Sequence, residues 1–379
     1  MRIAVIGAGP GGLYFAYLWK RRHPDAQIDL FEQNPEGATW GFGVVFSDQA
    51  LEFLRADDPD TVDAITPQME SWNNITVNLR GQSVEIDGVG FSSIGRLELL
   101  NILQQRVRAV GVAPRYGTTI RWISELEGYD LVVAADGLNS LVRRSFEGAF
   151  GTTVSHATNK FAWYGTRKSF ATLSQTFVKT DLGAFNAHHY RYSPDMSTFL
   201  VECDAATWQA YGFADKTIEQ SQAICEQVFA ATLDGHSLVS NNSIWRSFPW
   251  VWNENWSHGN MVLIGDALHS AHFSIGSGTR LAIEDAIALA RALEAEAGIP
   301  AALARYQAER KPIVAKLVKA ARTSADWYEH FPEHMKRDLM DFAYGYITRS
   351  GRIDDARLRA MSPAFMARYE AEKSIGSRP

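Results

Sequence analysis

A glycine-rich turn directly after the first apolar run is the feature that most constrains the fold of this chain. Arg2–Ile6 has the composition of a buried strand, and a helical pattern of apolar residues begins at Leu13. Between them Gly7, Gly9 and Gly12 form the spacing G-x-G-x-x-G. A strand, a tight turn and a helix in this order predict the first unit of a parallel α/β sheet.

The same turn predicts a dinucleotide site. A second apolar run, Gln27–Phe31, ends at Glu32, about 20 residues past the last glycine. In this context the glycines allow the turn and the close approach of a pyrophosphate, and the acidic residue accepts hydrogen bonds from a ribose. The residues expected to contact the dinucleotide are Gly7, Gly9, Gly11, Gly12 and Glu32.

A later stretch, Gly265–Ala286, fits the same ligand. It follows the apolar run Asn260–Ile264, and its Gly-rich part leads into a second helical pattern. The N–H groups and the positive dipole end of a helix N-terminus favour an anionic or acceptor-rich ligand. The residues expected at the ligand are Gly265, Asp266, Gly276, Ser277, Gly278 and Thr279.

Two further side chains are candidates for the same site. Asp136 ends the apolar run Asp130–Ala135, and ligands of α/β domains bind at the carboxyl ends of strands. Arg96 opens a predicted helix, where its guanidinium is either solvated or close to an acceptor of the ligand. Two aspartates at strand ends and one glycine motif together indicate an extended ligand with several hydroxyl groups.

From about Phe161 the pattern changes to that of an antiparallel sheet, and the alternation over Ile75–Val84 predicts an inserted hairpin. The expected fold class is α/β (α+β overall), with a Rossmann-like dinucleotide-binding domain, an antiparallel-sheet substrate domain and C-terminal helices. The expected boundaries are 1–73, 95–156 and 256–320 for the first domain, 74–94 and 157–255 for the second, and 321–379 for the C-terminal helical region.

Composition excludes several classes of protein. A net charge of −6 argues against nucleic-acid binding, and no apolar run approaches the ~20 residues of a membrane span. Cys203 and Cys225 have no metal-ligand spacing, so we expect reduced thiols and no metal site. The first glycine turn follows the initial Met within a few residues, so we expect no signal peptide and a cytoplasmic location.

With these motifs in place, the chain resembles the single-component flavoprotein aromatic hydroxylases of the p-hydroxybenzoate hydroxylase fold. The resemblance rests on Gly7–Gly12, Asp136-Gly137 and Gly265-Asp266-Ala267, and it covers residues 1 to about 320. It implies FAD as cofactor, NADH or NADPH as reductant and O2 as co-substrate, and a homodimer is a possible assembly.

The resemblance also implies roles for the candidate residues. It puts the ADP half of FAD on Gly7–Gly12 and Glu32, and the ribityl and phosphate groups near Arg96, Asp136 and Asp266. Gly276–Thr279 would lie at the pyrimidine edge of the flavin ring, where a helix N-terminus stabilises negative charge on the reduced ring.

Several runs narrow the resemblance further. Phe273 stands where the wider family usually has proline, and Arg280 where it often has asparagine. The runs Trp40–Asp48, Trp256–Asp266 and H-x-A-H-F-S-I-G-S-G-T look like those of hydroxylases of aryl-CoA thioesters. The salicylyl-CoA 5-hydroxylases are nearest, and the monooxygenase half of aminobenzoyl-CoA monooxygenase/reductase is similar. A flavin hydroxylase of violacein biosynthesis shares the run H-F-S-I-G.

The reaction implied by the resemblance is hydroxylation by a flavin C4a-hydroperoxide, formed with NAD(P)H and O2. Transfer of an electrophilic OH requires a ring with an electron-donating group ortho or para to the target carbon. A 2-hydroxy group activates position 5, which favours salicylyl-CoA giving gentisyl-CoA. The alternatives are another hydroxy- or aminobenzoyl-CoA and a free indole-type aromatic.

Three other classes would share the FAD motifs. A flavin halogenase would carry W-x-W-x-I-P, but here Trp250-Val251-Trp252 continues with Asn253. A flavin oxidase or dehydrogenase would release peroxide without a hydroxylated product. A non-catalytic sensor would bind the cofactor without any NAD(P)H oxidation stimulated by substrate.

Candidate residues for substrate and catalysis come from position alone. His272 is the candidate base, with His188, His189, Tyr190 and Tyr192 as others. CoA phosphates need cations at the pocket mouth, for which the candidates are Lys160, Arg167, Lys168 and Arg191. The residues expected to line the substrate pocket and exclude water from it are Phe42, Val44, Trp163, Tyr164, His189 and Phe273.

Overall fold

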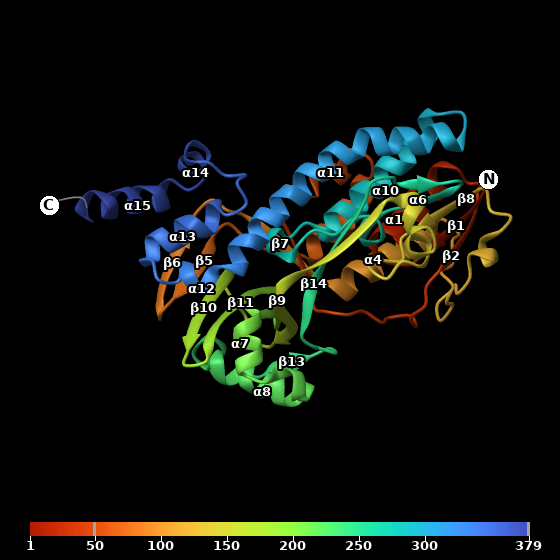
Figure 1. Cartoon of the computed structure of the whole chain (residues 1–379). Helices are drawn as coiled ribbons and strands as arrows, with labels where there is room; N and C mark the ends of the chain where they lie inside the picture. The colour runs from red at the N-terminus through yellow and green to blue at the C-terminus, as the bar shows by residue number, and fades with distance from the viewer. Residues whose placement is uncertain (48–50, 377–379) are drawn as a thin grey trace.

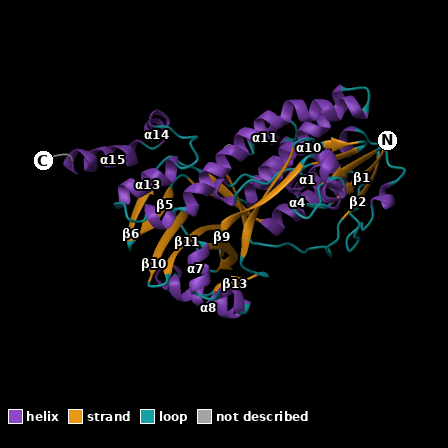
Figure 2. Ribbon diagram, viewed as in Figure 1, coloured by secondary structure: helices purple, strands orange, loops and turns teal. Residues whose placement is uncertain are grey.

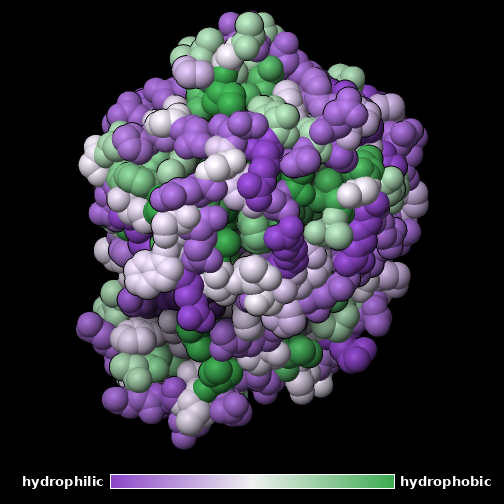
Figure 3. Space-filling model, turned by 90° about the vertical axis from the view of Figure 1, so that its right-hand side faces the viewer, coloured by the Kyte–Doolittle hydropathy of each residue, from purple (hydrophilic) through white to green (hydrophobic). Residues whose placement is uncertain are grey.

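The computed structural model describes residues 1–47 and 51–376 of the chain, which form three sheets with helices packed on them (Figure 1; Figure 2). Asp48, the last residue of the Trp40–Asp48 run, lies outside the described residues. Over the face shown in Figure 3, hydrophobic residues are interspersed among hydrophilic ones. None of the described helices is both long enough and apolar enough to span a bilayer.

The first domain is built on a five-stranded sheet that confirms the predicted α/β class. β1 pairs in parallel with β2 and β8, and β16 continues the parallel order on the other side of β8. The carboxyl ends of these four strands therefore meet at one edge of the sheet. In spatial order the strands are β15 (Ser257–His258), β16 (Met261–Leu263), β8 (Leu131–Ala134), β1 (Arg2–Ile6) and β2 (Gln27–Phe31).

Three long helices of this domain pack against one another over the sheet. α1 (Pro10–Arg22) begins with proline, which suits the first turn because its missing N–H needs no partner there. α1 contacts both α4 (Arg96–Ala109) and α10 (Gly278–Ala295). The shorter elements of the domain are α2 (Glu52–Arg55), α3 (Pro59–Ile65), η1 (Thr66–Gln68), η2 (Ile123–Leu126), α5 (Leu141–Ser145), α6 (Glu147–Phe150), η4 (Gly265–Ala267) and η5 (Phe273–Ile275).

The second sheet carries the predicted antiparallel pattern. The inserted hairpin is present as β5 and β6, and β10 adds β5 in parallel to the rest. The strands run in the order β13 (Leu238–Ser240), β9 (Thr152–Thr166), β12 (Met196–Cys203), β11 (Gly183–Ser193), β10 (Leu173–Thr180), β5 (Ile75–Leu79) and β6 (Gln82–Ile86), and β14 (Arg246–Asn253) also pairs with β9.

One face of the second sheet packs on a group of short helices, where both cysteines are buried as free thiols. These elements are α7 (Ala205–Ala210), η3 (Phe213–Asp215), α8 (Ile218–Val228) and α9 (Ala230–Leu233). A small third sheet joins the two domains. It consists of β3 (Gly43–Ser47), β7 (Phe91–Gly95) and β4 (Glu70–Trp72).

The chain returns along α11 (Ile299–Glu329), which extends from the first domain to the second (Figure 1). The predicted C-terminal helices follow as α12 (Phe331–His334), α13 (Leu339–Thr348), α14 (Asp355–Met361) and α15 (Pro363–Gly376). Phe342 of α13 is fully buried, with ring centroids 4.7 Å from Phe177 and 5.4 Å from Trp327. The C-terminal helices thus share a core with β10 and the hairpin.

Replacing Phe342 with alanine tests this shared core. Phe342→Ala should lower the free energy of unfolding by about 3–5 kcal/mol, because the buried ring leaves a cavity between β10 and α11. Urea denaturation measures the change. The control is Leu182→Ala, at a side chain that is 53% exposed, and it should change stability by less than about 0.5 kcal/mol. Equal stability of the two variants would show that α13 is not part of the core.

Candidate functional site

The glycine turn lies at the carboxyl end of β1, as the sequence predicts, but its glycines differ in what surrounds them. Gly7 has a φ of +99°, and a Cβ atom on Gly7 would overlap the carbonyl of Ala135. A Cβ on Gly12 would overlap the Gly7 carbonyl, and one on Gly11 would lie 3.1 Å from the Ala282 carbonyl. A Cβ on Gly9, by contrast, would meet no atom within 4 Å. Three of the glycines therefore serve packing, and Gly9 faces open space.

Glu32 is held beside this turn at the end of β2. Its Oε2 accepts a hydrogen bond from the Ala8 backbone N–H at 2.9 Å. Its Oε1 accepts from the backbone and side-chain N–H groups of Asn34, each at 2.8 Å. The carboxylate is thus oriented before any ligand binds, in the place where the fingerprint requires an acceptor for ribose.

Asp136 and Asp266 are held at the same edge of the sheet. Asp136 Oδ2 accepts a hydrogen bond from Leu141 N–H at 2.7 Å, whereas Oδ1 is buried without a partner among the described residues. Asp266 is exposed to solvent, yet the surrounding protein raises its pKa through burial. A carboxyl group that water reaches but protein encloses lines a recess, and an unpartnered buried oxygen calls for a donor such as a ligand hydroxyl.

Arg96 is the first residue of α4 and lies close enough to Asp266 for the two charges to interact. Its Nε donates to Thr39 Oγ1 at 3.1 Å. Burial lowers the pKa of Arg96, and Asp266 acts in the opposite direction. The structure therefore brings Arg96, Asp136 and Asp266 to one side of the glycine turn, which fits the extended ligand that the sequence predicts.

A buried aspartate supports the loop at Gly265. Asp285 Oδ2 accepts from the Gly265 backbone N–H at 3.0 Å and lies 2.8 Å from His269 Nε2. Arg310 Nε donates to the other carboxylate oxygen at 2.9 Å. Burial works to raise the pKa of Asp285, but His269 and Arg310 hold it below its ordinary value. His269 is therefore bound to a structural carboxylate.

The following turn, η5, leads into α10. Gly276 has a φ of +59°, and a Cβ there would lie 3.0 Å from Val45 Cγ1, so the turn is closely packed. Ser277, the N-cap residue of α10, makes no side-chain bond to the helix and donates instead to the Ile275 carbonyl at 3.1 Å. The helix N-terminus at Gly278 and Thr279 thus has no side-chain cap, which fits a ligand in that position.

His272, the candidate base, lies directly before η5 and is buried among aromatic rings. Its ring centroid is 4.9 Å from Phe248 and 5.9 Å from Trp250, and its Nδ1 accepts from Ser274 N–H at 3.3 Å. Burial lowers the pKa of His272 to about 4, with Glu202 acting in the opposite direction. His272 is therefore neutral at pH 7, and its Nε2 carries the proton.

The two faces of the second sheet separate the predicted substrate residues. Tyr164, Phe199 and His189 are opposite one another in register and share the face covered by α7–α9. Trp163 and His188 share the other face with Leu200. Because successive strand residues point to opposite faces, Tyr164 and His189 do not lie with Trp163.

A loop of the first domain lies against this second face. A Cβ on Gly41 would be 2.7 Å from the Trp163 ring, and one on Gly165 would be 2.5 Å from the Phe42 ring. Tyr190 Oη donates to the Gly43 carbonyl at 2.9 Å. The contacts bring Phe42 and Trp163 together, with the neighbouring Val44 buried in the core of the first domain.

Phe273 reaches the same face from η5. Its ring centroid is 4.9 Å from that of Phe161 and 5.3 Å from that of His188. Of the predicted substrate residues, the structure thus gathers Phe42, Trp163 and Phe273 between the glycine loops and the sheet. Tyr164 and His189 remain behind the sheet.

A buried carboxylate that the sequence analysis did not select lies beside Phe273. Glu202 is 1% exposed, 3.3 Å from His188 Nε2, and accepts from Asn159 Nδ2 at 2.9 Å. No Lys or Arg of the described residues lies within ion-pair distance of it. Burial raises the pKa of Glu202, while His272 and the bond from Asn159 lower it. The sequence did contain a sign of this buried carboxylate, because Glu202 is a charged residue inside the apolar run Phe199–Cys203.

The cations predicted for CoA phosphates are mostly engaged elsewhere. Arg191 Nε donates to Glu70 at 2.6 Å, and Lys168 Nζ to Asp234 at 2.7 Å. Lys160 Nζ donates to Ser247 Oγ at 2.9 Å. Arg167 is exposed and lies only 3.7 Å from Asp195. Within the described ranges, no group of three or more His, Cys, Asp or Glu side chains is arranged to hold a metal ion.

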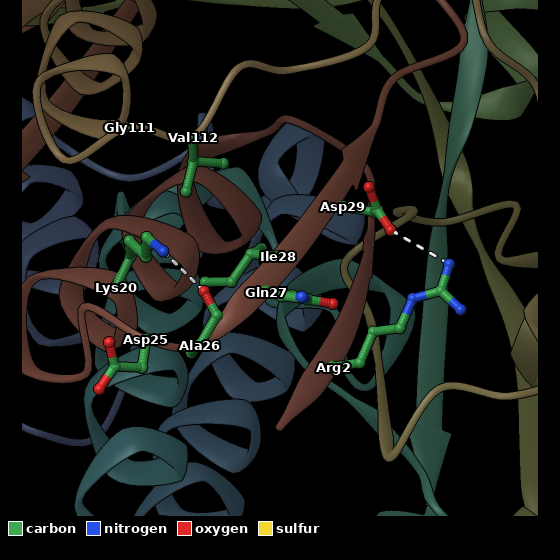
Figure 4. A pocket seen from close by; sticks show the side chains of 9 residues that line it. All are labelled: Arg2, Lys20, Asp25, Ala26, Gln27, Ile28, Asp29, Gly111 and Val112. Carbon is green, nitrogen blue, oxygen red and sulfur yellow. Dashed lines mark hydrogen bonds and ion pairs between the residues drawn. The ribbon is translucent and has the colours of Figure 1, made fainter.

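A separate surface hollow lies away from these residues. It is formed around Arg2, Lys20 and Gln27, where β1 and β2 begin (Figure 4). Lys20 Nζ donates to the Ala26 carbonyl at 2.7 Å, and Arg2 lies 3.6 Å from Asp29. Ligands of open α/β sheets bind beyond the carboxyl ends of the strands, so this hollow is not the dinucleotide site.

Known proteins share sequence with this chain over most of its length. A family model described as an FAD binding domain matches residues 104–321. The chain is 41% identical to salicyloyl-CoA 5-hydroxylase of a Streptomyces species, over 98% of this chain and 73% of that protein. It is 38% identical to 3-hydroxy-4-methyl-anthranilyl-[aryl-carrier protein] 5-monooxygenase of Streptosporangium sibiricum, over 93% and 95%.

The fold is also that of an oxygenase of known structure. The tetrameric form of 2-methyl-3-hydroxypyridine-5-carboxylic acid oxygenase superimposes with a TM-score of 0.70, over 92% of this chain and 95% of that one, at 16% identity. At this identity the likeness concerns the fold alone. It confirms the expected fold class, α/β with an antiparallel sheet and C-terminal helices.

A pair of alanine variants separates the glycine that faces the ligand from one that serves packing. Gly9→Ala should leave the stability of the FAD-free protein within about 1 kcal/mol and weaken FAD binding about tenfold, because its methyl group enters the open space where the glycine motif predicts a pyrophosphate. Gly12→Ala should destabilise the FAD-free protein by about 1–3 kcal/mol through overpacking. Thermal unfolding and FAD fluorescence titration measure the two effects. Equal loss of stability in both variants would contradict the assignment of Gly9.

Proposed function

The chain belongs to the FAD-dependent aromatic monooxygenases, and we propose that it hydroxylates the ring of an aromatic acid carried as a CoA thioester. Its substrate in this proposal is a 2-hydroxybenzoyl thioester, with salicylyl-CoA converted to gentisyl-CoA. The reaction consumes O2 and NAD(P)H, places one oxygen atom on the ring and releases the other as water. The observation that carries the proposal is the 41% identity to salicyloyl-CoA 5-hydroxylase over nearly the whole chain.

The names of two relatives support a carrier-bound substrate. Both specify an aromatic acyl group, one on CoA and one on an aryl-carrier protein, and both specify position 5 of the ring. A thioester withdraws electrons, so the ring needs a donor group para to the carbon that receives oxygen. A 2-hydroxy or 2-amino group meets this need at position 5.

The residues around the glycine loops fit FAD. When bound, FAD takes a hydride from NAD(P)H and activates O2. We assign the pyrophosphate to Gly7–Gly12, the adenosine ribose to Glu32, and the ribityl and phosphate groups to Arg96, Asp136 and Asp266. The open space at Gly9 and the unpartnered Asp136 oxygen support this assignment.

The uncapped N-terminus of α10 suits the edge of the flavin ring. We assign Gly276–Thr279 to this edge, where the positive end of the helix dipole stabilises negative charge. Phe42, Trp163 and Phe273 then stand between the ring and the second sheet. Their packing excludes water from the space where the substrate ring would lie.

Glu202, His188 and His272 form the group best placed to take the proton of the ring hydroxyl. Glu202 is in hydrogen-bond distance of His188 and in electrostatic contact with His272, and all three are buried. Burial disfavours the charged form of each group, whereas Glu202 and His272 each favour the charged form of the other. We propose that His272 accepts the proton at Nδ1, giving up the 3.3 Å bond from Ser274 N–H, and that Glu202 stabilises the resulting imidazolium.

Removing the charge of Glu202 tests this arrangement. Glu202→Gln should lower the pKa of His272 further, because the carboxylate acts to raise it. The weaker base should slow hydroxylation roughly 10- to 100-fold, within the range of general base catalysis, while FAD binding and reduction stay normal. Rapid-mixing kinetics and the ratio of product to NAD(P)H consumed measure the effect.

The matched control is Glu329→Gln. Glu329 also lies beside Asn159, where it accepts from the backbone N–H groups of Asn159 and Thr158, but it contacts neither histidine. A normal product ratio in Glu202→Gln, or the same loss in both variants, would remove Glu202 from the proposed role.

The substrate is tested with the purified, FAD-loaded protein. Oxidation of NADH and NADPH is followed with salicylyl-CoA, 2-aminobenzoyl-CoA and free salicylate in parallel. We expect stimulation by the CoA esters only, with a product heavier by one oxygen atom. Stimulation by free salicylate alone would contradict the thioester requirement. Light scattering of the same sample tests the homodimer, which stays a prediction.

A further inference from the structure

We propose that Arg349, contributed by the C-terminal helices, is a positioning residue for the turn that carries the flavin edge. The proposal rests on the proposed function in one respect, the assignment of Gly276–Thr279 to the flavin ring. It makes the segment after α12 part of the active site, although the sequence analysis predicted no functional residue in that segment.

The guanidinium of Arg349 contacts three structural elements at once. Its Nη2 donates to the Ser274 carbonyl of η5 at 2.7 Å, and its Nε donates to Ser324 Oγ of α11 at 3.1 Å. Its Nη1 donates to the Tyr346 carbonyl at 2.6 Å, at the C-terminal end of α13. One planar group therefore ties the turn to α11 and to the C-terminal helices.

Ser274 is held at every polar atom it has. Its carbonyl accepts from Arg349, its hydroxyl is 2.8 Å from that of Ser324, and its N–H donates to His272 Nδ1. Neither the backbone nor the side chain of Ser274 can move without losing one of these bonds. Arg349 bonds to both Ser274 and Ser324, and these two serines bond to each other, so the three residues form a closed ring of hydrogen bonds.

The turn passes this constraint on to α10. Gly276, two residues after Ser274, packs against Val45, and α10 begins at Gly278. The ring of Phe273 is fixed between Phe161 and His188. A displacement of Ser274 would therefore move both the N–H groups at the start of α10 and the ring that faces the substrate.

The surroundings of Arg349 favour arginine over lysine. Among the described residues, the groups that act on the charge of Arg349 are two tyrosines and no carboxylate, and its guanidinium lies 4.1 Å from the ring of Tyr346 and 5.5 Å from that of Tyr328. A guanidinium stacks on rings and donates in three directions in one plane, whereas an ammonium does not. The positive charge also acts on His188 and His272, whose pKa values it helps to lower.

The test compares FAD-loaded variants by a property of the bound cofactor. Arg349→Ala should weaken binding of reduced FAD relative to oxidised FAD by about tenfold, a shift of ~30 mV in the two-electron midpoint potential, because the helix N-terminus moves from the ring edge. The product formed per NAD(P)H should fall as well. Arg349→Lys keeps the charge but not the three contacts, so a positioning role predicts nearly the same loss.

Two further variants make the result decisive. Arg368→Ala removes an exposed arginine of α15 and should change neither potential nor coupling. Ser324→Ala removes one buried hydroxyl and keeps the guanidinium, so it reports on the contact set even if Arg349→Ala fails to fold, and it should shift the potential in the same direction.

Each outcome separates the two proposals. Shifted potentials in Arg349→Ala or Ser324→Ala, with a normal Arg368→Ala, support the positioning role. Unchanged potentials in folded, FAD-bound Arg349 and Ser324 variants overturn it, and so does full rescue by Arg349→Lys. A wild-type protein that oxidises NAD(P)H but hydroxylates no aryl thioester would overturn the proposed substrate and leave the potential measurement valid.

Discussion

The rest of the candidate site depends on the hydrogen bonds and ion pairs of one fully buried carboxylate, that of Asp285. A buried charge is costly unless it is paired and hydrogen-bonded, and Asp285 meets the backbone N–H of Gly265, the ring of His269 and the guanidinium of Arg310. These partners belong to the strand-end loop and to α11, while Asp285 itself belongs to α10. One charge therefore joins the strand-end loop, α10 and α11. These bonds fix the position of α10 relative to the loop and to α11.

α11 extends this alignment to the second domain. Near its beginning Arg310 binds Asp285, and near its end Ser324 and Tyr328 contact η5 and the polar residues of the sheet. Tyr328 Oη donates to Gln175, which in turn is hydrogen-bonded to His188. α11 is therefore bonded both to the strand-end loop and to the sheet that faces it, with Pro312 interrupting the backbone hydrogen bonds of the helix between the two places.

Local rules were sufficient for part of this structure. The strand, turn and helix at Gly7–Gly12 and the helix start at Gly278 follow from residues adjacent in sequence, and both were predictable. The face on which a residue lies was not, because moving one residue along β11 exchanges His188 for His189 and reverses the direction of the side chain. Arg349 was beyond prediction for another reason: its partner Ser274 is 75 positions earlier, and only the folded chain brings them together.

Three glycines lie at the contact between the first domain and the second sheet. Gly41, Gly43 and Gly165 each face a ring across the boundary, from Trp163, Tyr192 and Phe42. At these three positions even a methyl group would overlap the facing ring and push the first domain and the second sheet apart. The close approach of the first domain to the second sheet therefore depends on the absence of a side chain at these three positions.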